Sequence, residues 1–276
     1  MITSISNPKI KNVTQLLTGA RQRREQQLYV IEGVKMFQEA PASQIRQVFL
    51  TQEGYEKVRK IRPEIASLVT DGMMQNLRGP VCELVSDEVF GRMSDTKTPQ
   101  GVLCVMSMPQ WSVSSILEDA DRLLILVLEG IQDPGNLGTM IRSAEAAGAD
   151  FLLADMKTAD LYSPKVIRST MGAIFRVPVI YTDHLVRSLQ RLKSYGVHLC
   201  AAHLKGRQSL FDADFEEKCA FLIGNEGNGL SDEVTRLAES LIKIPMEGAV
   251  ESLNASVAAS LLLYEWKRKV DISSRF

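Results

Sequence analysis

Three turn segments in the second half of the chain combine glycines with amide, carboxylate and hydroxyl side chains. They are Glu129–Arg142, Ile223–Glu233 and Ile244–Ser256. Each follows an apolar run typical of a strand, and each leads toward a predicted helix. Ligands of open α/β sheets bind beyond the carboxyl ends of the strands, so these turns form a candidate binding site. Glycines allow the backbone to approach a ligand closely, and a helix N-terminus offers it free N–H groups.

The first turn does not match the common nucleotide-binding patterns. Asn136 and Leu137 follow Gly135, where a P-loop would require Lys and Ser or Thr, and no GxGxxG is present. An NTPase or an NAD-dependent oxidoreductase is therefore disfavoured. Arg142 lies about one and a half turns into the predicted helix. Its structural alternative is a surface arginine paired with Glu145 three residues later.

The other two turns also have purely structural alternatives. Three glycines, at positions 224, 227 and 229, suit either a close ligand or a set of tight turns. Ser231 is a predicted N-cap of a helix that follows the second turn, and Ser252 or Asn254 is a predicted N-cap of the last helix.

No conventional catalytic set competes with these turns. The three histidines have no metal-ligand spacing, and no GxSxG nucleophile motif is present, so metal catalysis and Ser-His-Asp hydrolysis are not expected. The four cysteines show no CxxC spacing and are interpreted as buried thiols of a reducing cytoplasm.

The surrounding elements alternate between strands and helices, which predicts layered α/β domains. In the second half we expect strands at residues 123–128, 151–154, 177–181, 197–202, 220–223 and 241–244, and helices at 137–147, 185–195, 232–238 and 257–269. In the first half we expect helices at 8–27, 34–39 and 53–60, and apolar or strand segments at 28–31, 47–50, 67–70 and 102–106. The predicted organisation is an N-terminal domain at 1–106, a linker at 107–121 and a parallel-sheet domain at 122–276.

Composition is that of an ordinary globular protein, with 45% hydrophobic residues and a formal net charge of −1 over 276 residues. This balance excludes a generally basic nucleic-acid coat protein. No apolar run reaches membrane-span length and no signal pattern opens the chain, so we expect a cytoplasmic protein. The first 24 residues nevertheless hold five basic side chains and no acid, which suggests an anionic partner or simply a solvated helix face: Lys9, Lys11, Arg21, Arg23 and Arg24.

Taken together and in order, the three turns carry a family resemblance. Asn136–Arg142, Gly224–Leu230 and Ile244–Ser256 resemble the three motifs of the SpoU (TrmH-like) RNA 2′-O-ribose methyltransferases of the SPOUT superfamily. Arg168–Ala173 matches the segment that this family has between its first two motifs. Ile5–Lys11, Glu32-Gly33 and Thr98–Gly101 resemble, more loosely, the family's N-terminal RNA substrate-binding domain.

The resemblance implies a parallel α/β fold with a C-terminal trefoil knot, preceded by a smaller α/β domain. It further implies that the knot loops bind S-adenosylmethionine, and that the protein is a homodimer whose active sites draw on both subunits. The residues matching the family's catalytic positions are Arg142, Glu226 and Asn254, supported by Asn136. The cofactor contacts implied are Gly224, Ile244 and Leu253, with Met246, Gly229 and Ser256 nearby.

The implied activity is S-adenosylmethionine-dependent 2′-O-ribose methylation of structured RNA, with 23S rRNA as the expected target and no metal. The alternatives are methylation of tRNA, or a catalytically silent RNA-binding module of the same fold. The chemistry is a direct displacement in which the ribose 2′-oxygen needs a fixed cation beside its developing charge. Arg142 suits that role because a guanidinium stays charged and offers several donors. The basic N-terminal segment would then attract RNA phosphates.

Overall fold

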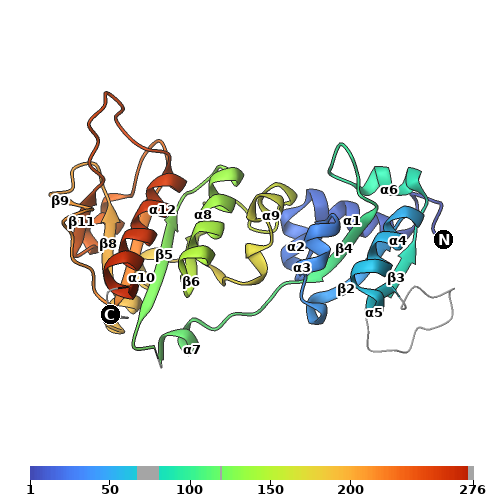
Figure 1. Cartoon of the computed structure of the whole chain (residues 1–276), viewed down its shortest axis with the longest axis horizontal. Coiled ribbons are helices and arrows are strands. Elements are labelled where there is room, and N and C mark those ends of the chain that lie inside the picture. Colours follow the sequence, from blue (N-terminus) through green and yellow to red (C-terminus); the bar gives the residue numbers. More distant parts are fainter. Residues whose placement is uncertain (67–80, 119, 273–276) are drawn as a thin grey trace. The chain divides into compact units, whose positions relative to one another are not determined.

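The chain divides into two compact units. The computed structural model describes residues 1–66, 81–118 and 120–272. The first unit comprises residues 1–110 and 162–168, and the second comprises residues 111–161 and 169–276 (Figure 1). Within the described ranges, no helix has the length and apolar character needed to cross a membrane.

In its described residues, the first unit is built around a four-stranded sheet in the order β1-β4-β2-β3. Strand β4 is antiparallel to β1 and β2, whereas β2 and β3 are parallel. The strands are β1 Leu28–Glu32, β2 Ile45–Leu50, β3 Val81–Leu84 and β4 Val102–Ser107. The helices are α1 Pro8–Thr18, α2 Ala20–Gln26, α3 Val34–Glu39, α4 Gln52–Ile61, α5 Pro63–Ala66 and α6 Asp87–Met93. The strand predicted at 67–70 lies outside the described residues, and β3 and α6 were not predicted.

The single helix predicted over residues 8–27 is wrong, because the segment forms two helices that break at Gly19. Gly19 has an extended backbone with φ −112° and ψ 108°. The Arg23 guanidinium then donates to the carbonyl oxygens of Leu16 (2.5 Å) and Leu17 (3.1 Å) at the end of α1. These carbonyls have no partner within a helix, so the arginine side chain stabilises the break.

The described part of the second unit contains seven parallel strands in the order β7-β6-β5-β10-β8-β11-β9. This confirms the predicted parallel-sheet α/β domain; the trefoil knot stays a prediction. The strands are β5 Leu123–Glu129, β6 Phe151–Asp155, β7 Val179–Thr182, β8 His198–Ala202, β9 Gln208–Ser209, β10 Lys218–Gly224 and β11 Ser240–Lys243. Residues 123–128 of the central strand β5 are all buried, as their continuous apolar run predicts.

Helices cover this sheet and fix its loops. Figure 1 shows α8 (Pro134–Ala147) and α12 (Ala255–Trp266) side by side against the sheet, and the Ser143 and Ser260 hydroxyls join them at 2.7 Å. Apolar residues of α7 Val113–Glu118, α10 Leu185–Ser194 and α11 Asp232–Leu237 form one buried cluster with alternate residues of β5, β8 and β10. Helix α7 and its buried Leu117 therefore occupy part of the segment predicted to be a linker. Helix α9 (Pro164–Thr170) and β9 were not predicted.

The strand order places two of the candidate turns next to each other. Strand β10 pairs with β5 in parallel register up to Gly224 opposite Glu129. Both strands therefore end at the same level, and the turns that follow them leave the sheet as neighbours. All four cysteines are buried free thiols, as predicted, and the Cys219 and Cys200 sulfurs lie 3.6 Å apart on adjacent strands.

Candidate functional site

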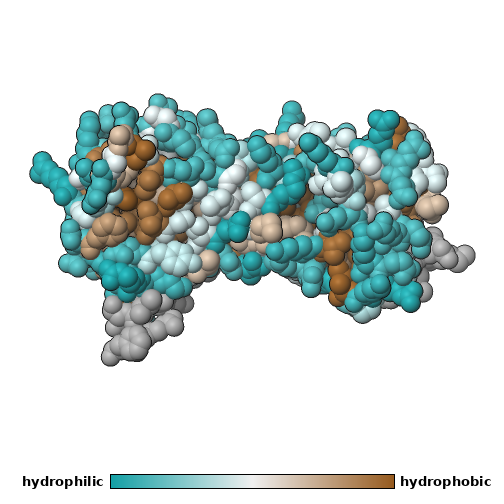
Figure 2. Space-filling view, turned by 45° about the horizontal axis from the view of Figure 1, so that its top comes forward, coloured by the Kyte–Doolittle hydropathy of each residue, from teal (hydrophilic) through white to brown (hydrophobic). Residues whose placement is uncertain are grey.

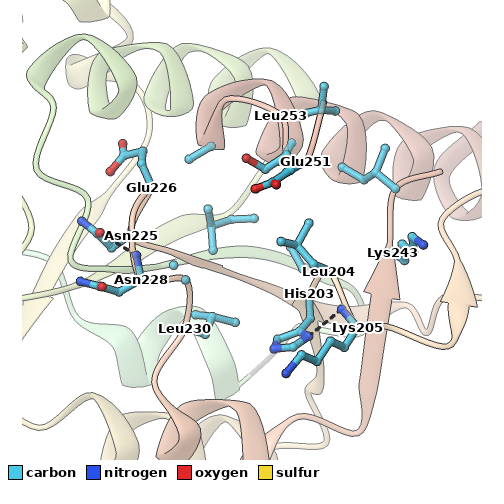
Figure 3. A pocket seen from close by; sticks show the side chains of 18 of the residues that line it. His203, Leu204, Lys205, Asn225, Glu226, Asn228, Leu230, Lys243, Glu251 and Leu253 are labelled. Atoms are coloured by element: carbon cyan, nitrogen blue, oxygen red, sulfur yellow. Dashed lines mark hydrogen bonds between the residues drawn. The ribbon is translucent and has the colours of Figure 1, made fainter. Parts of the chain in front are cut away.

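The second and third turns enclose a cavity of about 500 Å3 at the carboxyl edge of the seven-stranded sheet. The cavity is bounded by the ends of β8, β10 and β11 and by the start of α12 (Figure 3). Five of the six residues predicted to contact a cofactor line it: Gly224, Gly229, Ile244, Met246 and Leu253. Ser256 does not; its side chain is buried and donates to Asn254 Oδ1 at 2.6 Å.

Glycine is required where β10 enters the second turn. A Cβ on Gly224 would lie 2.2 Å from the carbonyl carbon of Gly229 and 2.3 Å from the nitrogen of Leu230. Asn225 and Gly229 exchange two backbone hydrogen bonds, at 3.1 and 2.8 Å. Gly229 has φ +67°, a left-handed conformation that favours glycine. The turn therefore closes tightly on itself and forms one wall of the cavity.

The three turns are joined by side-chain hydrogen bonds among predicted catalytic residues. Asn254 Nδ2 donates to Asn136 Oδ1 at 2.9 Å, and Asn136 Nδ2 donates to Glu226 Oε1 at 2.7 Å. Each residue comes from a different turn, so the fold brings together positions that lie 90 and 118 residues apart. We call Asn136, Glu226 and Asn254 the amide–carboxylate cluster. It presents exposed polar groups beside the cavity.

The capping predictions hold alongside this cluster. Asn254 Oδ1 accepts from the Ser256 N–H at 2.9 Å and so caps α12, while its amide nitrogen faces Asn136. Ser231 caps α11 by accepting from the Val234 N–H at 3.3 Å. Capping and site formation are thus combined in Asn254.

Arg142 is exposed on α8 and is not joined to the amide–carboxylate cluster by a hydrogen bond in this chain. Among the described residues it has neither a hydrogen bond nor an ion pair. The alternative partner, Glu145, accepts instead from Arg176 Nε at 2.7 Å, so the predicted i,i+3 surface pair does not form. The guanidinium therefore remains available on the surface of the second unit.

Several residues that line the cavity were not predicted from the sequence. They are His203, Leu204, Lys205, Lys243 and Glu251. His203 Nδ1 accepts from the Lys205 N–H at 3.1 Å, which folds the loop after β8 toward the cavity (Figure 3). The available signal was the predicted strand at 197–202, because its carboxyl end lies at the same edge of the sheet as the other turns.

The five basic residues near the N-terminus differ in their availability. Lys9 is paired with Glu83, and Arg21 pairs with Glu25 at 2.6 Å while remaining exposed. Arg23 is only 4% exposed and holds the break between α1 and α2, so it cannot contact RNA as predicted. Lys11 and Arg24 are exposed, and neither side chain has a partner among the described residues.

Comparison with family models matches both parts of the chain. Residues 123–264 match the SpoU rRNA Methylase family, and residues 7–104 match the MRM3-like substrate binding domain. The first match contains the three turns and the whole cavity.

Individual relatives cover nearly the entire chain. The 23S rRNA (guanosine(2553)-2′-O)-methyltransferase RlmP of Bacillus subtilis is 31% identical over 95% of this chain and 97% of its own. The AdoMet-bound rRNA methyltransferase from Sinorhizobium meliloti is 28% identical with a TM-score of 0.81, covering 98% of this chain and 97% of its own. The SpoU methyltransferase AviRb from Streptomyces viridochromogenes, in complex with AdoMet, is 26% identical with a TM-score of 0.81 and covers 97% and 99%.

Proposed function

This chain belongs to the SpoU rRNA methylase family, and from that premise we propose how its residues transfer a methyl group and to which RNA. It is an S-adenosylmethionine-dependent RNA 2′-O-ribose methyltransferase. The observation that carries the residue assignments is the amide–carboxylate cluster, which joins all three turns beside the cavity.

The cavity suits S-adenosylmethionine in size and lining. Its volume of about 500 Å3 lies within the range of small-molecule sites. Figure 3 shows Leu253 and Glu251 on one side of it and Leu230 and His203 on the other. Apolar side chains can hold the adenine, while Glu251 and backbone groups of the turns supply polar contacts. In this proposal Gly224, Ile244 and Leu253 contact the cofactor, with Met246 and Gly229 nearby and Ser256 supporting Asn254 from behind.

Arg142 stabilises the reacting ribose oxygen in this mechanism. When bound, S-adenosylmethionine supplies an electrophilic methyl group that the ribose 2′-oxygen attacks as a neutral thioether leaves. The Arg142 guanidinium stabilises the negative charge that develops on this oxygen. It is too weak a base to take the hydroxyl proton, which passes to an RNA phosphate or another nearby group. Asn136, Glu226 and Asn254 orient the nucleotide, and no residue assignment requires a metal.

A homodimer would complete the site. Val257, Leu261 and Tyr264 are 46%, 38% and 50% exposed along one face of α12. Figure 2 shows hydrophobic residues gathered on this part of the second unit. A helix that is apolar on all sides is normally buried, so a second copy covering α12 is the expected occupant. The neighbouring α8 would then bring Arg142 to the partner's amide–carboxylate cluster.

We further propose that residues 1–106 bind the RNA, that the target is 23S rRNA and that the protein acts in the cytoplasm. The match of residues 7–104 to a substrate binding domain and the target named for the Bacillus subtilis relative support this proposal. Exposed Lys11 and Arg24 would attract phosphates. Lys9 and Arg21 would contribute when an RNA phosphate replaces the carboxylate with which each is now paired.

Transfer of a labelled methyl group tests the target directly. The purified protein is incubated with labelled S-adenosylmethionine and either 23S rRNA or tRNA from cells lacking the gene, and ribose methylation is mapped. We expect one 2′-O-methylated nucleotide in 23S rRNA. Label found only in tRNA would contradict the proposed 23S rRNA target and identify tRNA as the substrate. Binding of RNA without label in either would favour the silent binding module.

A further inference from the structure

The dipeptide Gly130–Ile131, which starts the first turn, is hydrogen-bonded through all of its backbone polar groups. The Gly130 N–H donates to Asp155 Oδ1 at 2.9 Å, and the Ile131 N–H donates to Thr158 Oγ1 at 3.2 Å. The two carbonyl oxygens accept from Asn225 Nδ2 at 2.9 Å and from the Ala159 N–H at 2.8 Å, respectively. All four backbone polar groups of the dipeptide therefore bond to other segments of the second unit.

Asp155 and Thr158 form a buried pair dedicated to this contact. They are 8% and 5% exposed, and polar side chains this deeply buried must have partners to be tolerated. Asp155 Oδ1 also accepts from the Thr158 N–H at 2.9 Å and from Thr158 Oγ1 at 2.8 Å. The Thr158 hydroxyl thus donates to the carboxylate and accepts from Ile131, which determines its orientation completely.

The dipeptide lies just before the start of α8 in the chain. Gly130 has φ +69°, so the chain turns sharply at the end of β5, and Ile131 is fully buried. Two residues later Asp133 caps α8 by accepting from the Asn136 N–H at 2.7 Å. A displacement of the dipeptide would therefore be transmitted to α8 and to the side chains of Asn136 and Arg142.

Asn225 links this dipeptide to the cavity. Besides holding the Gly130 carbonyl, its Oδ1 accepts from the Gly227 N–H at 2.9 Å and the Asn228 N–H at 3.2 Å. The first turn, which carries Asn136, and the second turn, which lines the cavity, are therefore connected through the Asn225 side chain. The Asp155–Thr158 pair supports this connection from the β6 side.

We propose that Thr158 and Asp155 are positioning residues for methyl transfer, which set the first turn, and with it Asn136 and Arg142, relative to the cofactor cavity. Neither residue lines that cavity, so they act on alignment and not on cofactor affinity. The proposal rests on the proposed function, in which Asn136 and Arg142 serve the reacting ribose. Misalignment of about 1 Å at a reacting centre can cost up to about 100-fold in rate.

A matched pair of substitutions tests it. Thr158→Val keeps the shape but removes the hydroxyl, whereas Thr158→Ser keeps the hydroxyl. We expect Thr158→Val to lower single-turnover methyl transfer by about tenfold or more, with S-adenosylmethionine Kd and RNA Kd close to the wild-type values. Thr158→Ser is expected to restore the rate. Asp155→Asn, which retains an oxygen acceptor, should be less impaired than Asp155→Ala.

Hydrogen exchange supplies a second readout, independent of activity. Peptides containing residues 130–137 should exchange faster in Thr158→Val than in Thr158→Ser, while peptides containing residues 244–253 stay unchanged. Wild-type rate and exchange in a folded Thr158→Val protein would overturn the proposal, as would a lower melting temperature with an unchanged rate. If the wild-type protein transfers no methyl group, the proposed function fails, and the exchange experiment still decides whether the pair holds the turn.

Discussion

Arg142 is the residue on which the proposed chemistry depends most directly. It is exposed, and the glutamate expected to pair with it is occupied by Arg176. The amide–carboxylate cluster differs from it in that its three side chains already hold one another. In the proposed mechanism, the side chains that orient the nucleotide are therefore held together within one chain, whereas the charge that activates the oxygen comes from a separate, exposed side chain.

Replacing this guanidinium should affect the rate and not cofactor binding. We expect Arg142→Ala to lower single-turnover methyl transfer by about 100-fold or more, because it removes the stabilisation of a developing oxyanion. Binding of S-adenosylmethionine, measured by calorimetry, should be unchanged. Arg142→Lys keeps the charge but loses the planar set of donors, so its methyl-transfer rate should lie between those of the wild type and Arg142→Ala. A fully active Arg142→Ala protein would contradict the assignment.

Gly224 provides a test of the cavity wall. The added Cβ of Gly224→Ala would collide with the backbone of Gly229. Such overpacking costs about 1–3 kcal/mol, so we expect S-adenosylmethionine affinity to fall by about tenfold. The matched control is Gly91→Ala in α6, where a Cβ meets nothing within 4 Å. Equal calorimetric affinities for the two variants would show that the turn is not part of the cofactor site.

At the scale of elements, α12 combines three tasks. Its N-cap Asn254 joins the amide–carboxylate cluster, and its buried face covers β10. Its exposed face presents apolar side chains. The end of the helix is stabilised by an ion pair: Arg268 donates to Glu265 from Nε at 2.9 Å and from Nη2 at 2.6 Å. Asn254 lies at the other end of the helix, so we expect loss of this ion pair to lower the stability of the fold more than it changes the site.

The ion pair predicts a pH dependence of stability. The side-chain hydrogen bonds from Arg268 lower the pKa of Glu265 below its ordinary value of 4.5. A carboxyl group with a lowered folded-state pKa stabilises the fold above its unfolded pKa, and this contribution is lost as pH falls through the folded pKa. Glu265→Gln should therefore melt below the wild type at pH 7, with the gap in melting temperature closing in acid below pH 4.5. A gap that widens in acid would contradict this.

At the scale of the whole molecule, association and RNA binding are the two proposed properties. Both concern surfaces that the fold leaves exposed: the apolar face of α12 in the second unit, and the basic side chains near the start of the first. They call for different partners, since one surface is apolar and the other positively charged. Each can be changed without touching the cavity.

A charge on the α12 face should prevent dimerisation. We expect Leu261→Asp to sediment as a monomer, where the wild type sediments as a dimer, and to lose methyl transfer because Arg142 no longer reaches a partner's site. Phe211→Asp is the control, since Phe211 is 57% exposed but lies outside α12.

Co-expression of Arg142→Ala with Asn254→Ala should restore activity if the sites are shared between subunits. A monomeric wild-type enzyme would refute the shared site.

Removing the free basic side chains should weaken RNA binding at low salt. For Lys11→Ala combined with Arg24→Ala, we expect the slope of log affinity against log salt to fall by about 1 for each RNA phosphate that is no longer neutralised. Lys57→Ala in α4, a cation already paired with Glu53 at 2.8 Å, serves as the control. An unchanged slope in a salt titration would remove these two residues from the RNA-binding surface.

The sequence by itself determined much of the local structure, and the resemblance of its three turns to one family indicated the chemistry. Continuous apolar runs identified β5 and its parallel neighbours, Asn254 and Ser231 were recognisable as caps, and the three turns were identified by residue type and order. These features depend on residues close together in the chain, so periodicity and spacing reveal them.

Only the tertiary structure decided which distant residues meet. Strand β10 pairs with β5, and this pairing brings Asn225 within hydrogen-bond distance of Gly130 and Glu226 within hydrogen-bond distance of Asn136. Arg23 was indistinguishable in sequence from its exposed neighbours, yet the break at Gly19 buries it against carbonyl groups. Strand order and the direction of a helix break depend on the free energy of packing the whole unit, which no local pattern contains.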